Sequence, residues 1–379
     1  MFWLLYDPLT LIALIIAYVV GFAALLITAG YIAPRVARKF SEKYTLPASM
    51  AIIGLLVVVS GLAGVGLVVY LVSSALGVEE ALGIAISALF FVLILNAISY
   101  LISPLTINIM YGAKPSSQLQ KIVNSVAAKL GLSKPPKAVV VQGPPNAFAY
   151  GNVLLGKYVA VSSSLMDIAT PEELEAIIGH ELGHHKHRDN AIMLFMGLIP
   201  SVLYFLGISL IRVGFIAGYT RHYNSDSERR RDSGGLVFLL AGIAAIVLSF
   251  VVQVLVLAFS RLREYYADAA GAYATTSRTM QRALARLHVY YAQRPVAREA
   301  VSSSKIKALF IYAFTNAYAN PLYQSTPPAW DARSVNIDHV VEQLKKQKVE
   351  DASEFFSTHP PIPKRIRFLD TLVFQEVRV

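Results

Sequence analysis

Apolar and polar residues alternate along this chain in long blocks. Five blocks are almost free of charged side chains: Leu9–Ile32, Met50–Val72, Ala81–Pro104 (or on to Met110), Ala191–Ile211 and Leu236–Phe259. A helix needs about 20 apolar residues to cross the hydrocarbon core of a bilayer, and each block is long enough. Buried core helices of a soluble protein do not explain five such blocks in one chain. The pattern therefore predicts a multi-pass membrane protein with about five transmembrane helices.

Residues 112–190 and 260–379 form the two mainly polar stretches. In the first, Ser116–Leu130 has amphipathic periodicity, which predicts a helix, and the runs Lys137–Gln142 and Lys157–Ser162 are short and β-rich, which predicts strands. Thr170-Pro-Glu-Glu173 then combines a capping threonine, a proline at the first helical position and a glutamate three residues after the cap. These signals predict that a helix starts here.

Positive charge in short loops marks the cytoplasmic side of a membrane protein. The loop after the first block holds four basic residues, Arg35, Arg38, Lys39 and Lys43. Glu79 and Glu80 lie between the second and third blocks, so the N-terminus is expected outside and the stretch after the third block inside. Arg221 and Arg229–Arg231, in the loop between the last two blocks, argue against this orientation. We expect a plasma-membrane protein whose active site is cytoplasmic.

Composition agrees with a membrane location and excludes several classes of protein. Only 15% of the residues are charged, whereas a soluble domain carries about 25%. The net charge of +10 suits the anionic headgroups of a lipid bilayer, and no nucleic-acid motif accompanies it. No Gly-x-x-x-x-Gly-Lys-Ser/Thr loop is present, so no nucleotide is implied. The absence of cysteine excludes disulfides, thiol catalysis and iron–sulfur clusters.

The motif His180-Glu181-Leu-Gly-His184 follows the predicted helix start by ten residues. Two histidines at positions i and i+4 lie on one face of a helix, so both imidazoles can reach one metal ion. Glu181 is placed to take a proton from a water at that metal. The motif therefore predicts a hydrolytic site with one zinc ion per chain.

The residues directly after this motif are not expected to bind the metal. His185 and His187 point away from the metal-binding face and, with the basic residues between and after them, are typical of a solvated or headgroup-facing patch. Asp189 is expected to bond a backbone group or a basic neighbour, not a metal.

A hydrolytic zinc site takes three protein ligands, so one more must come from another part of the chain. Glu264 is the best candidate, because the two apolar blocks between His184 and Glu264 form an out-and-back hairpin that returns the chain to the same face of the membrane. Asp268 follows one helical turn later and could accept a hydrogen bond from the outer nitrogen of a ligand histidine. Read in isolation, Glu264 and Asp268 are also typical of a solvated helix start near a membrane.

Four motifs occur in a fixed order: Asn146-Ala-Phe-Ala149, His180–His184 with Asp189, Glu264-Tyr-Tyr-Ala-Asp268, and Thr358-His-Pro-Pro361 with Arg365-Ile366. This order resembles the HtpX-type, Ste-type and Oma-type integral-membrane zinc metallopeptidases, and the HtpX type most specifically. The resemblance covers roughly residues 115–270 and 350–370. It departs from the familiar HtpX pattern in the N-terminal spans, of which three are predicted here instead of two.

The resemblance implies further roles. An edge strand would lie beside the active site, where its unpaired N–H and C=O groups bind an extended substrate backbone. Its residues would be Asn146, Ala147, Phe148 and Ala149. His359 and Arg365 would lie near the zinc, where a donor stabilises the oxyanion formed when water attacks a peptide carbonyl. From the residues alone, His359 lies in a stiff loop and Arg365 is a surface charge.

Together these features predict an α+β zincin-like membrane protein, mainly helical, with a small mixed sheet next to the His180–His184 helix. We expect three spans in residues 1–112, a zincin subdomain in 113–190, a transmembrane hairpin in 191–260 and a C-terminal catalytic subdomain in 261–379. The implied function is ATP-independent zinc endopeptidase activity on misfolded or damaged membrane proteins, that is, membrane-protein quality control. Two alternatives stay open: a Ste-type prenyl-protein endopeptidase and a catalytically silent membrane scaffold.

Overall fold

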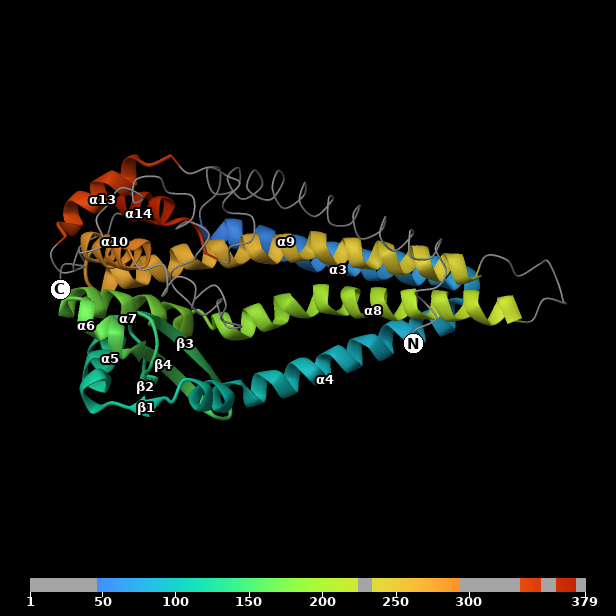
Figure 1. The fold of residues 1–379 in the computed structure, drawn as a ribbon, viewed down its shortest axis with the longest axis horizontal. Coiled ribbons are helices and arrows are strands. Elements are labelled where there is room, and N and C mark those ends of the chain that lie inside the picture. Colours follow the sequence, from blue (N-terminus) through green and yellow to red (C-terminus); the bar gives the residue numbers. More distant parts are fainter. Residues whose placement is uncertain (1–45, 224–233, 294–334, 349–358, 373–379) are drawn as a thin grey trace. The chain divides into compact units, whose positions relative to one another are not determined.

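The computed structural model describes residues 46–223, 234–293, 335–348 and 359–372 (Figure 1). The chain divides into two compact units that are interleaved in sequence. The helical unit comprises Met1–Ile98 and Met193–Phe259, and the mixed unit comprises Ser99–Ile192 and Ser260–Val379. The predicted first span, Leu9–Ile32, the basic group Arg229–Arg231 and Thr358 lie outside the described residues.

Long apolar helices build the helical unit. They are α3 (Leu46–Leu76), the first part of α4 (Val78–Met110), most of α8 (Asp189–Tyr223) and the first part of α9 (Gly234–Ala274). Within the described ranges, four stretches are long and apolar enough to cross a membrane: Ala48–Ser73, Val78–Met110, Ala191–Ile216 and Gly235–Ala274. The second to fifth predicted blocks are thereby confirmed as long helices, and the chain is a multi-pass membrane protein.

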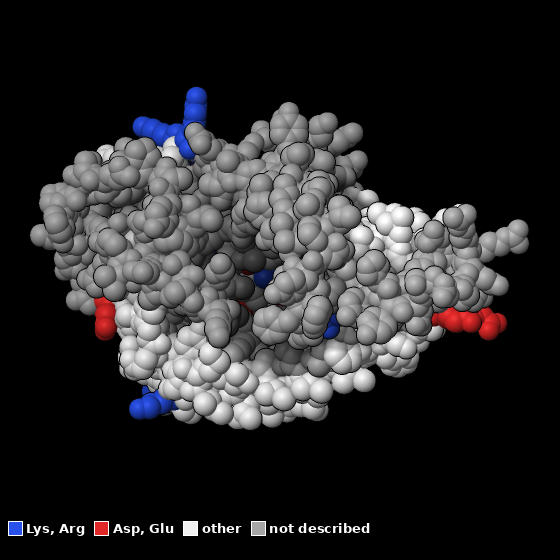
Figure 2. All heavy atoms as spheres, turned by 45° about the vertical axis from the view of Figure 1, so that its right-hand side comes forward, with Lys and Arg blue, Asp and Glu red and all other residues white. Residues whose placement is uncertain are grey.

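Small residues let α8 and α9 approach closely inside the helical unit. A Cβ atom added to Gly207 would lie 2.8 Å from the carbonyl oxygen of Gly242, and one added to Gly242 would lie 2.7 Å from that of Gly207. Such contacts are typical of transmembrane helix pairs, where packing and not hydrophobicity drives association. Charged side chains are sparse on the described surface of the face drawn in Figure 2, as expected for a protein surrounded by lipid.

The mixed unit contains a four-stranded sheet with the order β1-β2-β4-β3. The strands are β1 (Lys114–Pro115), β2 (Lys137–Val141), β3 (Ala147–Asn152) and β4 (Gly156–Ser162). β2 and β4 are parallel, whereas β1 with β2 and β3 with β4 are antiparallel, so the sheet is mixed as predicted. Among the described residues β3 is an edge strand, with β4 on one side and no further strand on the other.

Helices cover the sheet and complete the core of the mixed unit. They are α5 (Ser117–Lys129), α6 (Ser163–Ile168), α7 (Pro171–Lys186), the end of α9, α10 (Ser277–Gln293), α13 (Ile337–Lys346) and α14 (Ile362–Asp370). One buried cluster joins Val159 and Val161 of β4 to Val123 of α5, Ile178 of α7 and Leu284 of α10. The fold class, mainly helical with a small mixed sheet next to the His180–His184 helix, is confirmed.

The capping signals found in the sequence form the start of α7. Thr170 caps the helix, and Thr170 and Glu173 form a reciprocal capping box ahead of Pro171. The Glu173 carboxylate also accepts hydrogen bonds from Arg286 of α10, at 2.5 Å from Nε and 2.9 Å from Nη2, and both side chains are buried. A buried, bidentate arginine–carboxylate pair fixes geometry strongly. The capping glutamate therefore also ties α7 to α10.

Candidate metal centre

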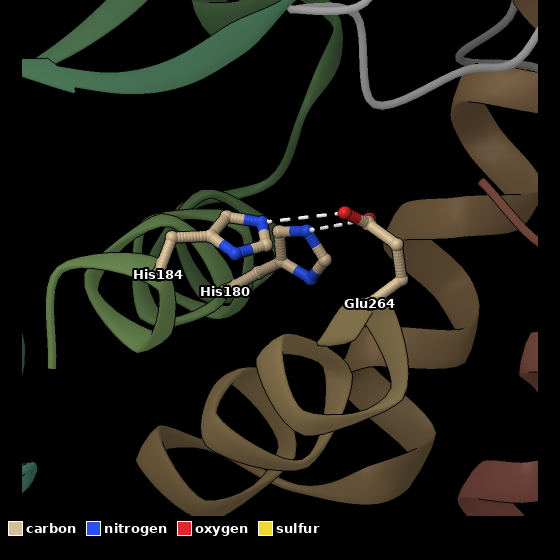
Figure 3. A group of neighbouring side chains, drawn as sticks. All are labelled: His180, His184 and Glu264. Carbon is tan, nitrogen blue, oxygen red and sulfur yellow. Dashed lines mark ion pairs between the residues drawn. The ribbon is translucent and has the colours of Figure 1, made fainter. Parts of the chain in front are cut away.

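Three side chains converge between α7 and α9 (Figure 3). His180 and His184 project from one face of α7 toward Glu264 on α9, as the spacing predicted. Nε2 of His180 lies 3.5 Å from Glu264 Oε2, and Nε2 of His184 lies 3.7 Å from Glu264 Oε1. His180 and Glu264 are buried, and the side chain of His184 is only 12% exposed. The three residues are suitable ligands for a single metal ion.

The spacing of these atoms fits a zinc ion. Zn–N and Zn–O bonds of about 2.1 Å at tetrahedral angles place neighbouring ligand atoms roughly 3.4 Å apart. The 3.5 and 3.7 Å separations are close to that value and too long for good hydrogen bonds. Although burial lowers the pKa of His180, the carboxylates of Asp268 and Glu264 raise it overall to about 9. The centre therefore favours positive charge, which a divalent cation supplies.

Both histidines are held by a carboxylate on the side away from Glu264. Nδ1 of His180 lies 3.0 Å from Asp268 Oδ1, the partner expected one turn after Glu264. Nδ1 of His184 lies 2.6 Å from Asp189 Oδ2. A carboxylate at Nδ1 keeps a proton there and turns Nε2, with its lone pair, toward the metal position.

The sequence analysis did not assign Asp189 to His184. It expected Asp189 near a basic neighbour, and Arg263 Nε does lie 3.5 Å from Asp189 Oδ2. The bond to His184 depends on the turn after α7, where Arg188 has a φ of 57°. A left-handed arginine is uncommon, so no local sequence pattern predicts this turn. The one available signal was the family motif, which includes an aspartate five residues after the second histidine.

Arg365 does not take the position expected for an oxyanion donor. Its guanidinium is fully buried and binds Asp268, at 2.8 Å from Nε to Oδ2 and 2.5 Å from Nη2 to Oδ1. Nη2 lies 3.5 Å from Nδ1 of His180, on the ring edge opposite the metal-facing Nε2. These contacts indicate a positioning residue: Arg365 compensates the buried charge of Asp268, which in turn orients His180.

Glu181 lies beside the metal ligands and against the edge strand. It is buried, and the backbone N–H of Ala149 in β3 donates a hydrogen bond to its carboxylate. Burial, opposed by the charge of His180, raises the pKa of Glu181 to about 7. A carboxyl group whose pKa lies near neutrality can both accept and release a proton under physiological conditions.

The predicted substrate strand lies at the open edge of the sheet. Asn146 directly precedes β3, and its carbonyl accepts from the N–H of Ser162 in β4 at 2.8 Å. Because backbone groups alternate sides along an antiparallel strand, those of Ala147 and Ala149 then face away from β4. Phe148 points to the opposite face of the sheet from the α7 core, into an aromatic cluster with Tyr111. The backbone groups of Ala147 and the carbonyl oxygen of Ala149 thus face the side of Glu181, where the N–H of Ala149 is already bonded to the Glu181 carboxylate.

His359 reaches the centre from the segment before α14. Its Nδ1 lies 2.7 Å from Glu264 Oε2, and the side chain is nearly buried. The structure therefore brings His359 to the metal ligands, across 95 residues of sequence from Glu264. A protonated imidazole here can donate a hydrogen bond to an anion formed beside Glu264.

The prediction of a solvated patch after the motif is wrong for His185 and right for His187. His185 is buried, and its Nε2 donates to the carbonyl of Tyr158 in β4 at 2.8 Å. Burial lowers its pKa to about 4, so the ring is neutral. α7 packs against β4 on this face, which a helical projection of α7 alone does not reveal. His187 is exposed and packs against the ring of Tyr266.

Glycines bring the two ligand-bearing helices together. A Cβ atom added to Gly183 of α7 would lie 2.8 Å from the Cβ of Ala270 and 3.1 Å from the Cα of Ala267 in α9. One added to Gly271 of α9 would lie 2.6 Å from the carbonyl oxygen of Ala176. The helices therefore cross at nearly backbone contact, and this close crossing lets the short side chain of Glu264 reach both histidines.

Comparisons with known proteins agree with this geometry. The model of peptidase family M48 matches residues 113–373. A protein named Protease HtpX homolog from Pyrobaculum aerophilum is 46% identical over 373 residues, which is 98% of this chain and 99% of that protein. One with the same name from Archaeoglobus fulgidus is 45% identical over 97% of this chain and 98% of its own length.

Among solved structures, the crystal structure of S. mikatae Ste24p aligns with 84% of this chain and 65% of its own, at 18% identity and a TM-score of 0.47. The family match runs from β1 to α14 and covers more than half of the chain, and the HtpX homologues match nearly the full length of the chain. This chain therefore belongs to peptidase family M48 and is one of its HtpX-type members.

Proposed function

We propose that this protein is a zinc-dependent endopeptidase that cleaves misfolded or damaged membrane proteins on the cytoplasmic side of the plasma membrane. One observation carries the proposal: His180, His184 and Glu264 converge, and Glu181 lies buried beside them, held by the backbone of an edge strand. A metal ligand set and a proton acceptor in one site are the requirements of metal-assisted hydrolysis.

Each residue has a chemical role in this proposal. His180, His184 and Glu264 would hold a zinc ion, which would supply polarisation of a carbonyl and a lowered pKa of water. Glu181 accepts a proton on its carboxylate from the attacking water and then passes that proton to the leaving amine nitrogen. The N–H of Ala149 keeps the Glu181 carboxylate in place. His359 donates from its imidazole to the oxyanion that develops on the former carbonyl oxygen.

The edge strand supports broad substrate use. A peptide that pairs with β3 is recognised through its main chain, so its side chains are read only weakly. Folded proteins rarely offer an unpaired extended segment, whereas unfolded ones do. A membrane-embedded enzyme with such a strand suits unfolded membrane proteins better than one short, defined sequence.

Two variants test the chemistry. We expect Glu181→Gln to abolish cleavage while about one zinc per chain stays bound, because Glu181 acts on the water and not on the metal. Glu264→Ala should lose zinc and activity together. Glu175→Gln, on the exposed surface of the same helix, is the matched control and should retain both. Full zinc in Glu264→Ala would mean that a different third ligand completes the site, and His359 would be tested next.

The substrate class needs a separate comparison. Purified enzyme would be given an unfolded membrane protein and a lipidated C-terminal peptide, each with and without a zinc chelator. Chelator-sensitive cleavage of the unfolded protein alone supports the proposal. Preference for the lipidated peptide would favour a prenyl-protein endopeptidase, and no cleavage of either substrate would favour a silent scaffold.

A further inference from the structure

The turn that joins β3 to β4 consists of three large apolar residues with unusual exposure. Val153 is 86% exposed, Leu154 72% and Leu155 44%. Tight turns in water normally carry Gly, Asn, Asp or Ser, whose side chains favour the turn backbone and are well solvated. The requirements of a turn therefore do not explain why three consecutive apolar residues are exposed at the end of this hairpin.

Three backbone groups of this turn are bonded within the hairpin. Oδ1 of Asn152 accepts hydrogen bonds from the N–H groups of Leu154 at 3.0 Å and Leu155 at 2.7 Å. The carbonyl oxygen of Leu155 accepts one from the hydroxyl of Tyr158 at 3.2 Å. A turn that enters lipid must satisfy its backbone groups internally, since no water is present to do so. This turn has apolar side chains outside and bonded polar groups inside.

The same asparagine ties the hairpin to a transmembrane helix. Nδ2 of Asn152 donates to the carbonyl oxygens of Tyr100 at 2.9 Å and Leu101 at 3.0 Å in α4. Tyr100 lacks its usual helical partner, because residue 104 is proline and has no N–H. Asn152 thus supplies the missing donor and fixes the hairpin beside α4.

This part of α4 also presents apolar side chains outward. Its exposed residues include Ile102, Leu105, Ile109 and Met110, and the whole helix is long and apolar enough to cross a membrane. The turn and this helix segment both belong to the mixed unit. The exposed turn is therefore adjacent to the apolar surface of a helix that is long and apolar enough to cross a membrane.

We infer that the β3–β4 turn, Val153-Leu154-Leu155, inserts into the lipid bilayer and places the membrane end of the substrate strand at the lipid boundary. Asn152 is the last residue of β3, next to the turn. Ala149, whose N–H binds Glu181, lies three residues before it in the same strand. Three residues of strand span roughly 10 Å. A chain that leaves the bilayer beside the turn can therefore pair with the free edge of β3 and reach Glu181 within a few residues. This delivery role rests on the proposed function, whereas insertion of the turn does not.

Insertion is tested by fluorescence quenching in proteoliposomes that contain the full chain. The chain has no cysteine, so Leu154→Cys can carry a single probe. We expect lipids with bromine on their acyl chains to quench this probe as strongly as one at Ile109→Cys on α4. A probe at Ser133→Cys, in the exposed polar loop before β2, is the control and should not be quenched. A Leu154 probe that behaves like the Ser133 probe would overturn insertion. So would shielding from both lipid and aqueous quenchers, which would mean that a second protein molecule covers the turn.

Delivery is tested with Val153→Ser/Leu154→Ser, which keeps Asn152 and the turn length. Because the variant loses two apolar side chains that would contact lipid, we expect cleavage of a membrane-anchored substrate to fall at least about tenfold. Cleavage of a soluble unfolded peptide should be unchanged, since neither residue contacts the metal centre. An equal effect on both substrates, or on neither, would overturn the delivery role. Failure of the unaltered enzyme on every substrate would overturn the proposed function, and the quenching result would still decide insertion.

Discussion

A carboxylate binds Nδ1 of each ligand histidine, but the two carboxylates come from different parts of the chain. Asp268, on the ligand helix α9, holds His180 and is itself held by buried Arg365. Asp189, in the turn after α7, holds His184 and lies near Arg263. Each chain of contacts ends in an arginine, so neither carboxylate is buried without a compensating positive charge. Metal affinity should therefore depend on residues that never contact the metal.

Asp189→Asn tests that dependence. The variant keeps an acceptor oxygen for His184 but removes the negative charge, so zinc affinity should fall by about 10–100-fold. Competition with a chelator of known affinity measures the change. Asp338→Asn, an exposed aspartate on α13, is the control and should bind zinc normally. Unchanged affinity in Asp189→Asn would show that the His184 bond has no part in metal binding.

His359 is expected to act on the transition state. A donor that binds the oxyanion and not the ground-state carbonyl lowers the barrier without improving substrate binding. His359→Ala should therefore lower kcat at least about tenfold with little change in KM. His359→Phe fills the same space without a donor and should behave alike. A rise in KM alone would make His359 a substrate contact, and loss of zinc would make it a metal ligand.

His288 gives the mixed unit a pH-dependent stability. It is buried in α10, and burial lowers its pKa to about 4. The unfolded chain, with an ordinary histidine pKa near 6.5, binds the proton first as pH falls. This stability is therefore complete above pH 6.5 and is lost as pH falls toward 4.

The variant His288→Leu removes this titratable group and so tests its contribution to stability. Between pH 7.5 and 5.5, wild type should lose about 1 kcal/mol more unfolding free energy than His288→Leu, as measured by pulse proteolysis. His339→Asn, an exposed histidine on α13, serves as the control and should follow wild type. Parallel pH profiles for wild type and His288→Leu would contradict the assignment.

At the scale of elements, the predictions succeeded where a local signal defines the structure. The capping box at Thr170 defined the start of α7, and β-branched runs defined β2 and β4. They failed where a contact between elements, or an uncommon backbone conformation, determines the position of a side chain. His185 is buried because α7 packs on β4, and Asp189 meets His184 because Arg188 is left-handed. The first fact depends on an element distant in sequence, and the second on a backbone conformation that an arginine rarely adopts.

The close crossing of α7 and α9 makes Gly183 a sensitive position. In Gly183→Ala the new methyl group would lie 2.8 Å from the Cβ of Ala270, so the helices must separate. A displacement of about 1 Å at the ligands typically costs about 10²-fold in activity. We expect that loss together with weaker zinc binding, measured by chelator competition. Gly197→Ala, where no atom lies within 4 Å, is the control. Normal zinc affinity in Gly183→Ala would show that the crossing distance is not critical.

At the scale of the whole molecule, the orientation in the membrane is still a prediction from loop charges. Because no native cysteine interferes, Glu79→Cys and Ser163→Cys can be labelled without background. A membrane-impermeant thiol reagent applied to intact cells should label residue 79 and leave residue 163 protected until the membrane is opened. The opposite result would place the metal centre outside.

The grouping of separate chain segments into two compact units depends on how the helices pack. Hydropathy located the spans well, since length and apolarity are properties of each segment. The unit boundaries, however, fall inside α4, α8 and α9, where composition changes little and the helix simply continues. Which part of a continuous helix packs with which neighbours is a long-range property. The sequence could therefore predict the histidine pair from its local spacing and Glu264 from the hairpin that returns the chain, but not which residues of each continuous helix belong to which unit.

Because the α8–α9 hairpin interrupts the mixed unit, the metal ligands are synthesised at different times during translation. Glu264 is translated 84 residues after His180 (264 minus 180). At ribosomal rates of 5–20 residues per second this delay is about 4–17 s. Throughout it, the nascent chain carries two histidines without their third ligand, and His359 arrives later still. A chain whose translation stops before Glu264 lacks the third ligand, so the complete ligand set exists only after both helices of the α8–α9 hairpin have been synthesised as far as that residue.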